Sequence, residues 1–245
     1  MTPNTHVSPN QTVSEIAAQS LGAVRVFERL GIDYCCGGKR PVEAACRDFG
    51  LDASAVLSEL DLAMAARPAN ETDWSKAPLH SLIGHIVGTH HVYLRLELPR
   101  LSQRLEKVMR VYGQRDNHTL APLPALLDGL RSELELHMRK EEMVLFPFIE
   151  KAEAAIHAGL PAPAAPFGSV ANPIAMMEHE HDSAGAALRR MRETTNNYAV
   201  PDYACITYRS LLEGLRELEQ DLHLHIHLEN NILFPRAIAM EMASR

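Results

Sequence analysis

Two copies of a His-x-x-x-Glu motif are the residues of this chain best suited to chemistry. The first copy spans residues 137–147 and the second spans residues 225–235; each runs from its histidine through an apolar stretch to a Phe-Pro pair. Residues four apart lie on the same face of an α-helix, so each copy presents an imidazole and a carboxylate together. Two copies with matched downstream residues predict a duplicated helix whose His/Glu pairs converge inside a bundle.

Two further histidines, His91 and His181, extend this repeat. Each has apolar residues four positions before it and seven and ten positions after it, namely Val87, Leu98 and Leu101, and Met177, Leu188 and Met191. The adjacent histidines, His90 and His179, lack this pattern. Because apolar periodicity marks the inward face of a helix, the pattern selects His91 and His181 as inward residues and leaves their neighbours in outer or solvated positions.

The repeat therefore predicts four imidazoles and two carboxylates facing the bundle interior. His225 is chosen because it matches His137: each lies nine residues before the phenylalanine of Phe-Pro. The six residues are His91, His137, Glu141, His181, His225 and Glu229. One zinc ion takes four ligands in a structural site, or three and a water in a catalytic one, so six are too many. Two ions bridged by both glutamates would each have four protein ligands, a bridging oxygen and an open position. Such mixed ligation suits iron, and the open position would bind O2 or NO.

Three acidic residues stand near the predicted ligands. Glu133 and Asp221 each lie four residues before a motif histidine, so each is expected to accept the second ring N–H of that histidine. The alternative is that both are ordinary acids on the helix surface. Glu180, directly before an inward histidine, is expected to face a substrate channel.

Cys35 and Cys36 are a separate feature, followed by Gly37-Gly38. Adjacent cysteines close only a strained disulfide ring, so they are poor structural staples. The glycines beside them indicate an exposed, accessible dithiol suited to redox or metal-handling work. The alternative is that two small residues pack a turn.

Composition narrows the class of protein. The chain has 245 residues, 46% of them hydrophobic, and a formal net charge of −7, which predicts no nucleic-acid partner. No apolar run approaches the roughly 20 residues that span a bilayer, and residues 1–10 are polar, so we expect no membrane segment, no signal peptide and a cytoplasmic location. The four cysteines have no disulfide or zinc-finger spacing and are expected to be free thiols.

The hydrophobic pattern predicts an all-α chain. A capping box at residues 12–15 should open a helix that Gly31 ends, and shorter helices should follow up to residue 66. After a linker at residues 67–77, four long helices are expected, near 78–112, 123–157, 172–195 and 201–242, with Asn172 capping the third and Pro201-Asp202 opening the fourth. We therefore expect a small helical domain at 1–67 and an antiparallel four-helix bundle at 78–245.

These motifs resemble the repair-of-iron-centres (RIC) family, the iron–sulfur cluster repair proteins with a hemerythrin-like domain. The resemblance rests on residues 33–38 (DYCCGG), on both motifs with their Leu-Phe-Pro ends, and on Glu180-His181-Asp182. It implies an oxo- and carboxylate-bridged centre of two iron ions held by the six inward residues, which binds NO and serves in nitrosative and oxidative stress. It also implies that Glu133 and Glu180 line a route to the surface. The doubled histidine at 90–91 departs from the family pattern, so the choice of His91 relies on the pattern of apolar residues before and after it.

Three functions remain open at this point. In the first, the protein donates iron to damaged iron–sulfur proteins, and Cys35 and Cys36 take part in the transfer. In the second, it is a scavenger or sensor of NO or O2, associated with denitrification, which needs the bundle but not the dithiol. In the third, it is an NO reductase, although no flavin or nicotinamide motif is visible to supply electrons. The sequence decides neither whether the chain is an enzyme nor whether it forms a homodimer.

Overall fold

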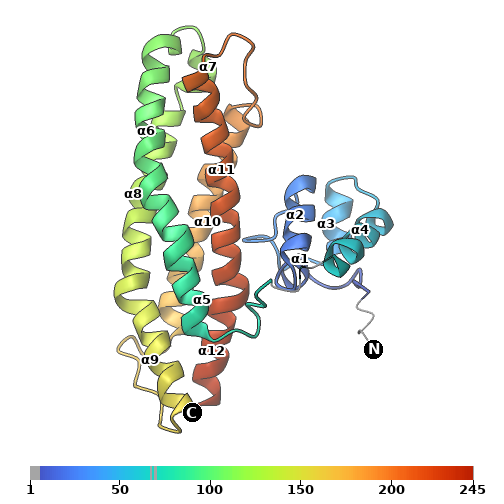
Figure 1. Cartoon of the computed structure of the whole chain (residues 1–245), viewed down its shortest axis with the longest axis vertical. Coiled ribbons are helices and arrows are strands. Elements are labelled where there is room, and N and C mark those ends of the chain that lie inside the picture. The colour runs from blue at the N-terminus through green and yellow to red at the C-terminus, as the bar shows by residue number, and fades with distance from the viewer. Residues whose placement is uncertain (1–5, 67, 69–70, 245) are drawn as a thin grey trace.

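The computed structural model describes residues 6–66, 68 and 71–244, and among them the regular elements are all helices. A small helical module lies beside a long bundle (Figure 1). The only pairing of extended backbone within the described part is a bridge between Thr12 and Pro41. The all-α prediction is confirmed. None of the described helices combines the length and the apolar character needed to cross a bilayer.

The N-terminal module contains four helices: α1 (Val13–Ala17), α2 (Leu21–Leu30), α3 (Val42–Asp48) and α4 (Ala53–Ala65). The expected capping box at Thr12 and Glu15 is present, and Gly31 ends α2 with a left-handed φ of +71°. The prediction of one continuous helix up to Gly31 was wrong. Ser20 adopts an extended conformation and its hydroxyl accepts the N–H of Gly22, so the segment breaks and α2 starts with a new N-cap.

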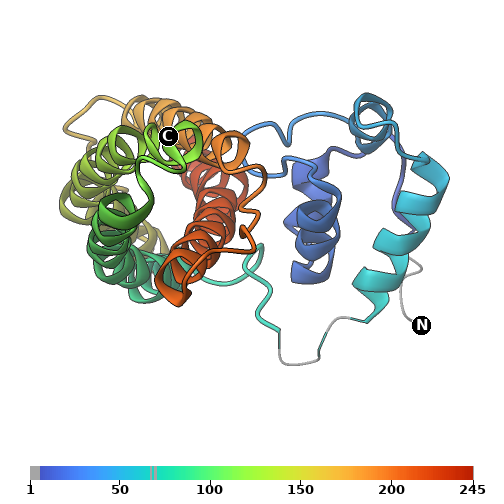
Figure 2. The same ribbon diagram turned by 90° about the horizontal axis from the view of Figure 1, so that it is seen from above.

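Four long helical rods form the bundle. The first comprises α5 (Leu79–His85), η1 (Ile86–His91) and α6 (Val92–Tyr112), and the second α8 (Leu123–Lys140), η2 (Glu141–Leu145) and α9 (Phe146–His157). The third is α10 (Ala171–Thr194), and the fourth comprises α11 (Ile206–Leu228), η3 (Glu229–Leu233) and α12 (Phe234–Ala243). The short α7 (Asn117–Leu120) lies between the first two. Figure 2 shows the rods as a ring, with the module beside α10 and α11.

Two helix starts in the bundle differ from the sequence prediction. Val170 is the N-cap of α10, whereas Asn172 lies inside the helix and its side-chain amide donates to the carbonyl of Phe167. The fourth rod begins after Cys205, four residues later than the Pro201-Asp202 pair suggested. Both errors arise because a residue suited to capping does so only where the preceding loop delivers it in the right conformation. Part of the predicted linker, at 67 and 69–70, lies outside the described residues.

Wide π-helical turns begin at the glutamate of each motif. The N–H of Phe146 donates to the carbonyl of Glu141, and that of Phe234 donates to the carbonyl of Glu229. The next residue in each copy is a proline, which has no N–H and whose ring collides with the carbonyl four residues back in a regular α-helix. The wider turn accommodates that proline, and turns of this kind are frequent at functional sites.

The linker and the first rod are held by polar contacts from other helices. The Glu153 carboxylate of α9 accepts the backbone N–H of Leu79 at 2.6 Å and that of His80 at 2.9 Å, so it caps α5 from outside. Arg236 of α12 donates to the carbonyls of Trp74 and Ala77, each at 2.7 Å. These bonds satisfy backbone groups that a helix end and a loop would otherwise leave without partners.

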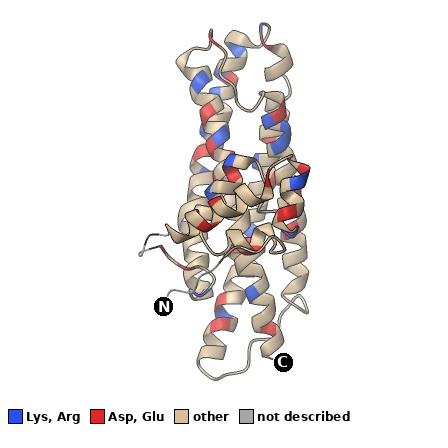
Figure 3. Ribbon diagram, turned by 90° about the vertical axis from the view of Figure 1, so that its right-hand side faces the viewer, with Lys and Arg blue, Asp and Glu red and all other residues tan. Residues whose placement is uncertain are grey.

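Charged side chains are distributed over both parts of the molecule. On the side that carries the module, basic and acidic residues are interleaved along the helices (Figure 3). Among the described residues of that side, acidic residues thus separate the basic ones along the helices.

Candidate metal centre

The structure brings all six inward residues predicted from the repeat into one buried region of the bundle. They form two groups in which the ligand atoms lie within 4.8 Å of one another: His91, Glu141, His225 and Glu229 in one group, and His137, Glu141, His181 and Glu229 in the other. Each of the six is at most 2% exposed. Both glutamates belong to both groups, which is the arrangement that two bridging carboxylates require.

Each glutamate contacts the histidine of its own motif and one histidine from another rod. Glu141 lies 3.3 Å from Nε2 of His137 and 3.4 Å from Nε2 of His91. Glu229 lies 3.1 Å from Nε2 of both His225 and His181. Within each group the Nε2 atoms also face each other, at 3.0 Å for His137 and His181 and at 3.3 Å for His91 and His225.

The outward ring nitrogens of three histidines have acceptors. Nδ1 of His91 lies 2.6 Å from Oε1 of Glu142, Nδ1 of His137 lies 2.8 Å from Oε2 of Glu180, and Nδ1 of His181 lies 2.7 Å from Oδ1 of Asn230. Because Nδ1–H of each ring donates to one of these acceptors, the ring in its neutral form directs an Nε2 lone pair inward. Lone pairs and carboxylate oxygens then meet without a hydrogen-bond donor, and a cation is what satisfies them. The residues therefore fit a metal centre.

The electrostatics of the site point the same way. Burial raises the pKa of Glu229, but His225 and His181 outweigh burial and hold that pKa well below its usual value. Burial lowers the pKa of His137, but the carboxylates of Glu141 and Glu229 raise it to about 9. The carboxylates are thus ionised, and the centre attracts positive charge, either as a proton on His137 or as a metal ion that displaces this proton.

The two acceptors predicted from the helix period were wrong. Glu133 is exposed and accepts from the hydroxyl of Ser183 at 3.1 Å, and Asp221 lies 2.9 Å from Nδ1 of His90. A residue four positions earlier shares the face of the histidine, whereas Nδ1 of His137 points across to α10, where Glu180 accepts its proton. The outer partner is therefore set by the neighbouring rod, which the helix period does not reveal.

The residues that sequence reasoning missed stand at matched positions of the repeat. Glu142 and Asn230 each directly follow a motif glutamate, and each accepts from an inward histidine of another rod. Two cations sit beside the outer carboxylates: Arg95 donates to Glu142 at 2.5 Å, and Lys140 pairs with Glu180. The sequence feature that could have identified Glu142 and Asn230 is their shared position, directly after a motif glutamate. His90, expected in an outer or solvated position, is only 2% exposed and stacks on His225, so it occupies an outer position and is not solvated.

The cysteine loop, residues 33–38, packs against the metal centre. The side-chain amide of Asn231 donates to the carbonyl of Tyr34 at 3.0 Å, and Sγ of Cys36 lies 3.8 Å from the carbonyl oxygen of His181. Asp33 accepts the backbone N–H groups of Cys35 and Cys36, each at 3.0 Å. The loop therefore joins the module to α10 and η3 next to an inward histidine.

The prediction of an exposed dithiol was wrong for Cys35, which is 5% exposed, while Cys36 is half-buried. The two sulfur atoms lie 3.8 Å apart. The hydrogen bond to Cys36, burial and the negative charge of Asp33 raise the pKa of Cys35 well above its usual value, so its thiol is protonated. Gly37-Gly38 serves close packing instead, because a Cβ at Gly38 would lie 2.6 Å from the carbonyl oxygen of Tyr34.

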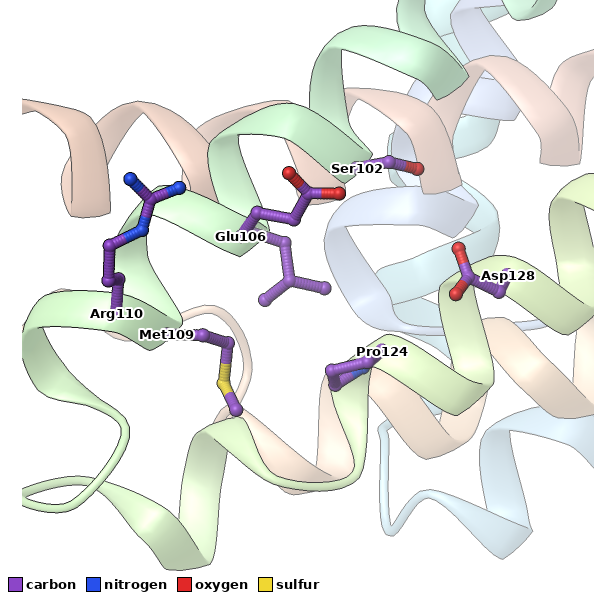
Figure 4. A pocket seen from close by; sticks show the side chains of 7 residues that line it. Ser102, Glu106, Met109, Arg110, Pro124 and Asp128 are labelled. Carbon is purple, nitrogen blue, oxygen red and sulfur yellow. The ribbon is translucent and has the colours of Figure 1, made fainter.

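A surface cavity of about 510 Å³ lies between α6 and the start of α8 (Figure 4). Its lining residues are Ser102, Leu105, Glu106, Met109, Arg110, Pro124 and Asp128. None of them belongs to the two histidine and glutamate groups.

The fold and this centre define a class of protein. A family model described as "Hemerythrin HHE cation binding domain" matches residues 82–237, and one described as "Domain of Unknown function (DUF542)" matches residues 9–64. The bundle is thus a hemerythrin-like, cation-binding domain, and its paired histidine and glutamate clusters suit a metal site.

Full-length relatives identify the family. Proteins named "Iron-sulfur cluster repair protein YtfE" are 39% identical in Citrobacter koseri and in Escherichia coli O81, each over 95% of this chain and 98% of the relative. The protein of that name from Pectobacterium atrosepticum is 37% identical over the same shares. The chain belongs to this family of iron–sulfur cluster repair proteins, and the resemblance found in its sequence is confirmed.

Proposed function

We propose that this protein binds two iron ions in its bundle and donates iron to damaged iron–sulfur clusters. The observation that carries the proposal is the pair of buried four-ligand groups that share Glu141 and Glu229. Bound there, iron would bind NO or O2 at an open position and would also be the cargo for repair. The names of the relatives support the repair role.

The side chains of this chain have distinct tasks in the proposal. Glu141 and Glu229, which belong to both groups, would hold both ions, and the four histidines would supply the remaining protein ligands. Glu142, Glu180 and Asn230 orient three of those rings, because each accepts an Nδ1 proton.

The same proposal gives the module a part in the transfer of iron. Cys36 lies against the carbonyl of an inward histidine and is the more exposed of the two cysteines, so it is suited to meet iron that leaves the centre. Glu180 contacts His137, and Glu133 bonds to Ser183 across the contact between α8 and α10. That placement supports a route along these two helices. The domain limits 1–67 and 78–245, the cytoplasmic location and the homodimer stay predictions.

A second candidate is a scavenger or sensor of NO or O2 that uses the bundle alone. The observation in its favour is that Cys35 is buried and its pKa is raised, since protonated thiols are poor nucleophiles and metal ligands. In this role NO binding would be reversible and independent of both cysteines.

One experiment separates the two functions. The purified protein is loaded with ferrous iron, its metal content and absorption spectrum are recorded, and it is added to an iron–sulfur enzyme inactivated by NO. Donation predicts two iron ions per chain, recovery of the enzyme and loss of recovery in Cys36→Ala. Recovery that never exceeds that of free iron at the same concentration would exclude donation. Tight, reversible NO binding that persists in the double variant Cys35→Ala, Cys36→Ala would then favour the scavenger.

A further inference from the structure

The internal repeat shows how the outer support of the inward histidines is built. Nδ1 of His91 donates to Glu142 in one half, and Nδ1 of His181 donates to Asn230 in the other. Both acceptors directly follow the glutamate of a motif, so they occupy equivalent positions. For this pair of histidines, both halves therefore place the acceptor directly after the motif glutamate.

The second pair of histidines breaks the symmetry. His137 donates to Glu180, which directly precedes the inward histidine of its own helix. The equivalent residue of the other half, directly before the inward histidine of the first rod, is His90, and the ring that it faces is His225. An acidic acceptor in one half is thus replaced by an imidazole in the other.

His90 does not take the place of that acceptor. Its Nδ1 lies 2.9 Å from Oδ1 of Asp221, and its ring stacks on His225 with centroids 5.5 Å apart and planes 8° apart. Within the described part of the chain, Nδ1 of His225 and Nε2 of His90 are both buried without a hydrogen-bond partner.

We propose that the iron ion held by His91 and His225 is the labile one of the pair and leaves first when iron is donated. This inference rests on the proposed function. A ring that binds metal through Nε2 carries its proton on Nδ1, and that proton needs an acceptor to fix the ring and raise its basicity. At the position held by His137 and His181, both rings have an acceptor for Nδ1–H. At the position held by His91 and His225, only His91 has one.

The assignment is tested first on the unmodified protein. Crystals loaded with ferrous iron are soaked briefly in the chelator ferrozine, and anomalous scattering at the iron edge measures the occupancy of each position. The expected result is loss at the His91/His225 position while the His137/His181 position stays occupied. Equal loss, or loss from the His137/His181 position, overturns the inference.

A variant that restores the acceptor provides an independent test. In His90→Gln, the side-chain carbonyl can accept the Nδ1 proton of His225 and the amide can donate to Asp221. The faster of two phases of iron release to ferrozine should slow about 10- to 100-fold, the usual effect of an outer partner on metal affinity. His179→Gln is the matched control, because His179 is exposed on α10, and it should leave both phases unchanged.

The converse variant is Asn230→Ala, which removes the acceptor of His181 and should speed the slower phase. Acceleration of the faster phase instead would contradict the assignment. A preparation that retains a single iron ion contradicts the two-iron stoichiometry of the proposed function, and the position of that ion still decides this inference. A chain whose two ions release at different rates but never reach a damaged cluster contradicts donation alone.

Discussion

The side-chain amide of Asn231 donates a 3.0 Å hydrogen bond to the backbone carbonyl of Tyr34, which ties the cysteine loop to the second motif. The same nitrogen lies 2.9 Å from Nδ1 of His227 and 3.5 Å from the carbonyl oxygen of Cys35. One residue of the bundle thus connects a motif that builds the metal centre to the loop that carries both thiols.

Asn231→Ala should therefore release the cysteine loop. The change removes the donor that holds the carbonyl groups of Tyr34 and Cys35, so the half-buried thiol of Cys36 should react faster with an alkylating reagent. The rate is measured by mass spectrometry after a short pulse of iodoacetamide. Asn172→Ala is the control, because its amide also donates to a backbone carbonyl but lies in another part of the bundle. An unchanged Cys36 rate in Asn231→Ala would mean that other contacts hold the loop.

The two shared carboxylates give a sharper prediction for metal content. Glu229→Ala should abolish binding of both iron ions, because Glu229 belongs to both groups, whereas His181→Ala should weaken only one. Iron per chain, measured after loading and gel filtration, checks the difference. Glu213→Ala, an exposed residue of α11, should retain the wild-type content. Retention of a full complement of iron by Glu229→Ala would show that this carboxylate is not a bridge.

Helix periodicity is sufficient to select the six side chains that meet in the bundle. The inward face of a long helix follows from its apolar pattern alone, so that pattern separates His91 from His90 and His181 from His179. The same periodicity predicts the lengths of the rods to within a few residues. Each of these features is determined by the sequence of a single helix.

The errors concern contacts between elements. The partner of His137 comes from another rod, so counting along its own helix pointed to Glu133 instead of Glu180. The burial of Cys35 depends on how the module docks, and nothing in the local sequence Cys-Cys-Gly-Gly reports that docking. Relative rotation of the helices and docking of the module are global properties, and a pattern in one segment does not encode them.

The external cap of α5 predicts a dependence of stability on pH. Glu153 accepts two backbone N–H groups, and although burial raises its pKa, these bonds and His80 hold it below the usual 4.5. Because the folded pKa is the lower one, the stabilisation is present above the unfolded pKa and is lost as the pH falls through the folded pKa.

Glu153→Gln should therefore lower the free energy of unfolding near pH 7 by about 1–3 kcal/mol, the range for hydrogen bonds to a charged group. The difference from wild type should begin to shrink below pH 4.5, the usual pKa of the group, and should be lost once the pH falls below the lowered pKa of Glu153 in the folded state. Urea unfolding of the metal-free protein at several pH values measures it, with Glu150→Gln on the same helix as control. A difference that is constant with pH would exclude the charge as its source.

Two glycine substitutions should change stability in opposite directions. A Cβ at Gly38 would lie 2.6 Å from the carbonyl oxygen of Tyr34 and 2.9 Å from Cβ of Ser14, so Gly38→Ala should cost about 1–3 kcal/mol through overpacking. Gly129 lies in α8 with open space around it, so Gly129→Ala should add about 0.5–1 kcal/mol. Thermal unfolding followed by circular dichroism compares the two variants with wild type. Because Gly38 lies in the cysteine loop, that variant should also label faster at Cys36, whereas Gly129→Ala should not. If Gly38→Ala unfolds at the wild-type temperature and labels at the wild-type rate, the close contact between this loop and α1 is not what holds the thiols in place.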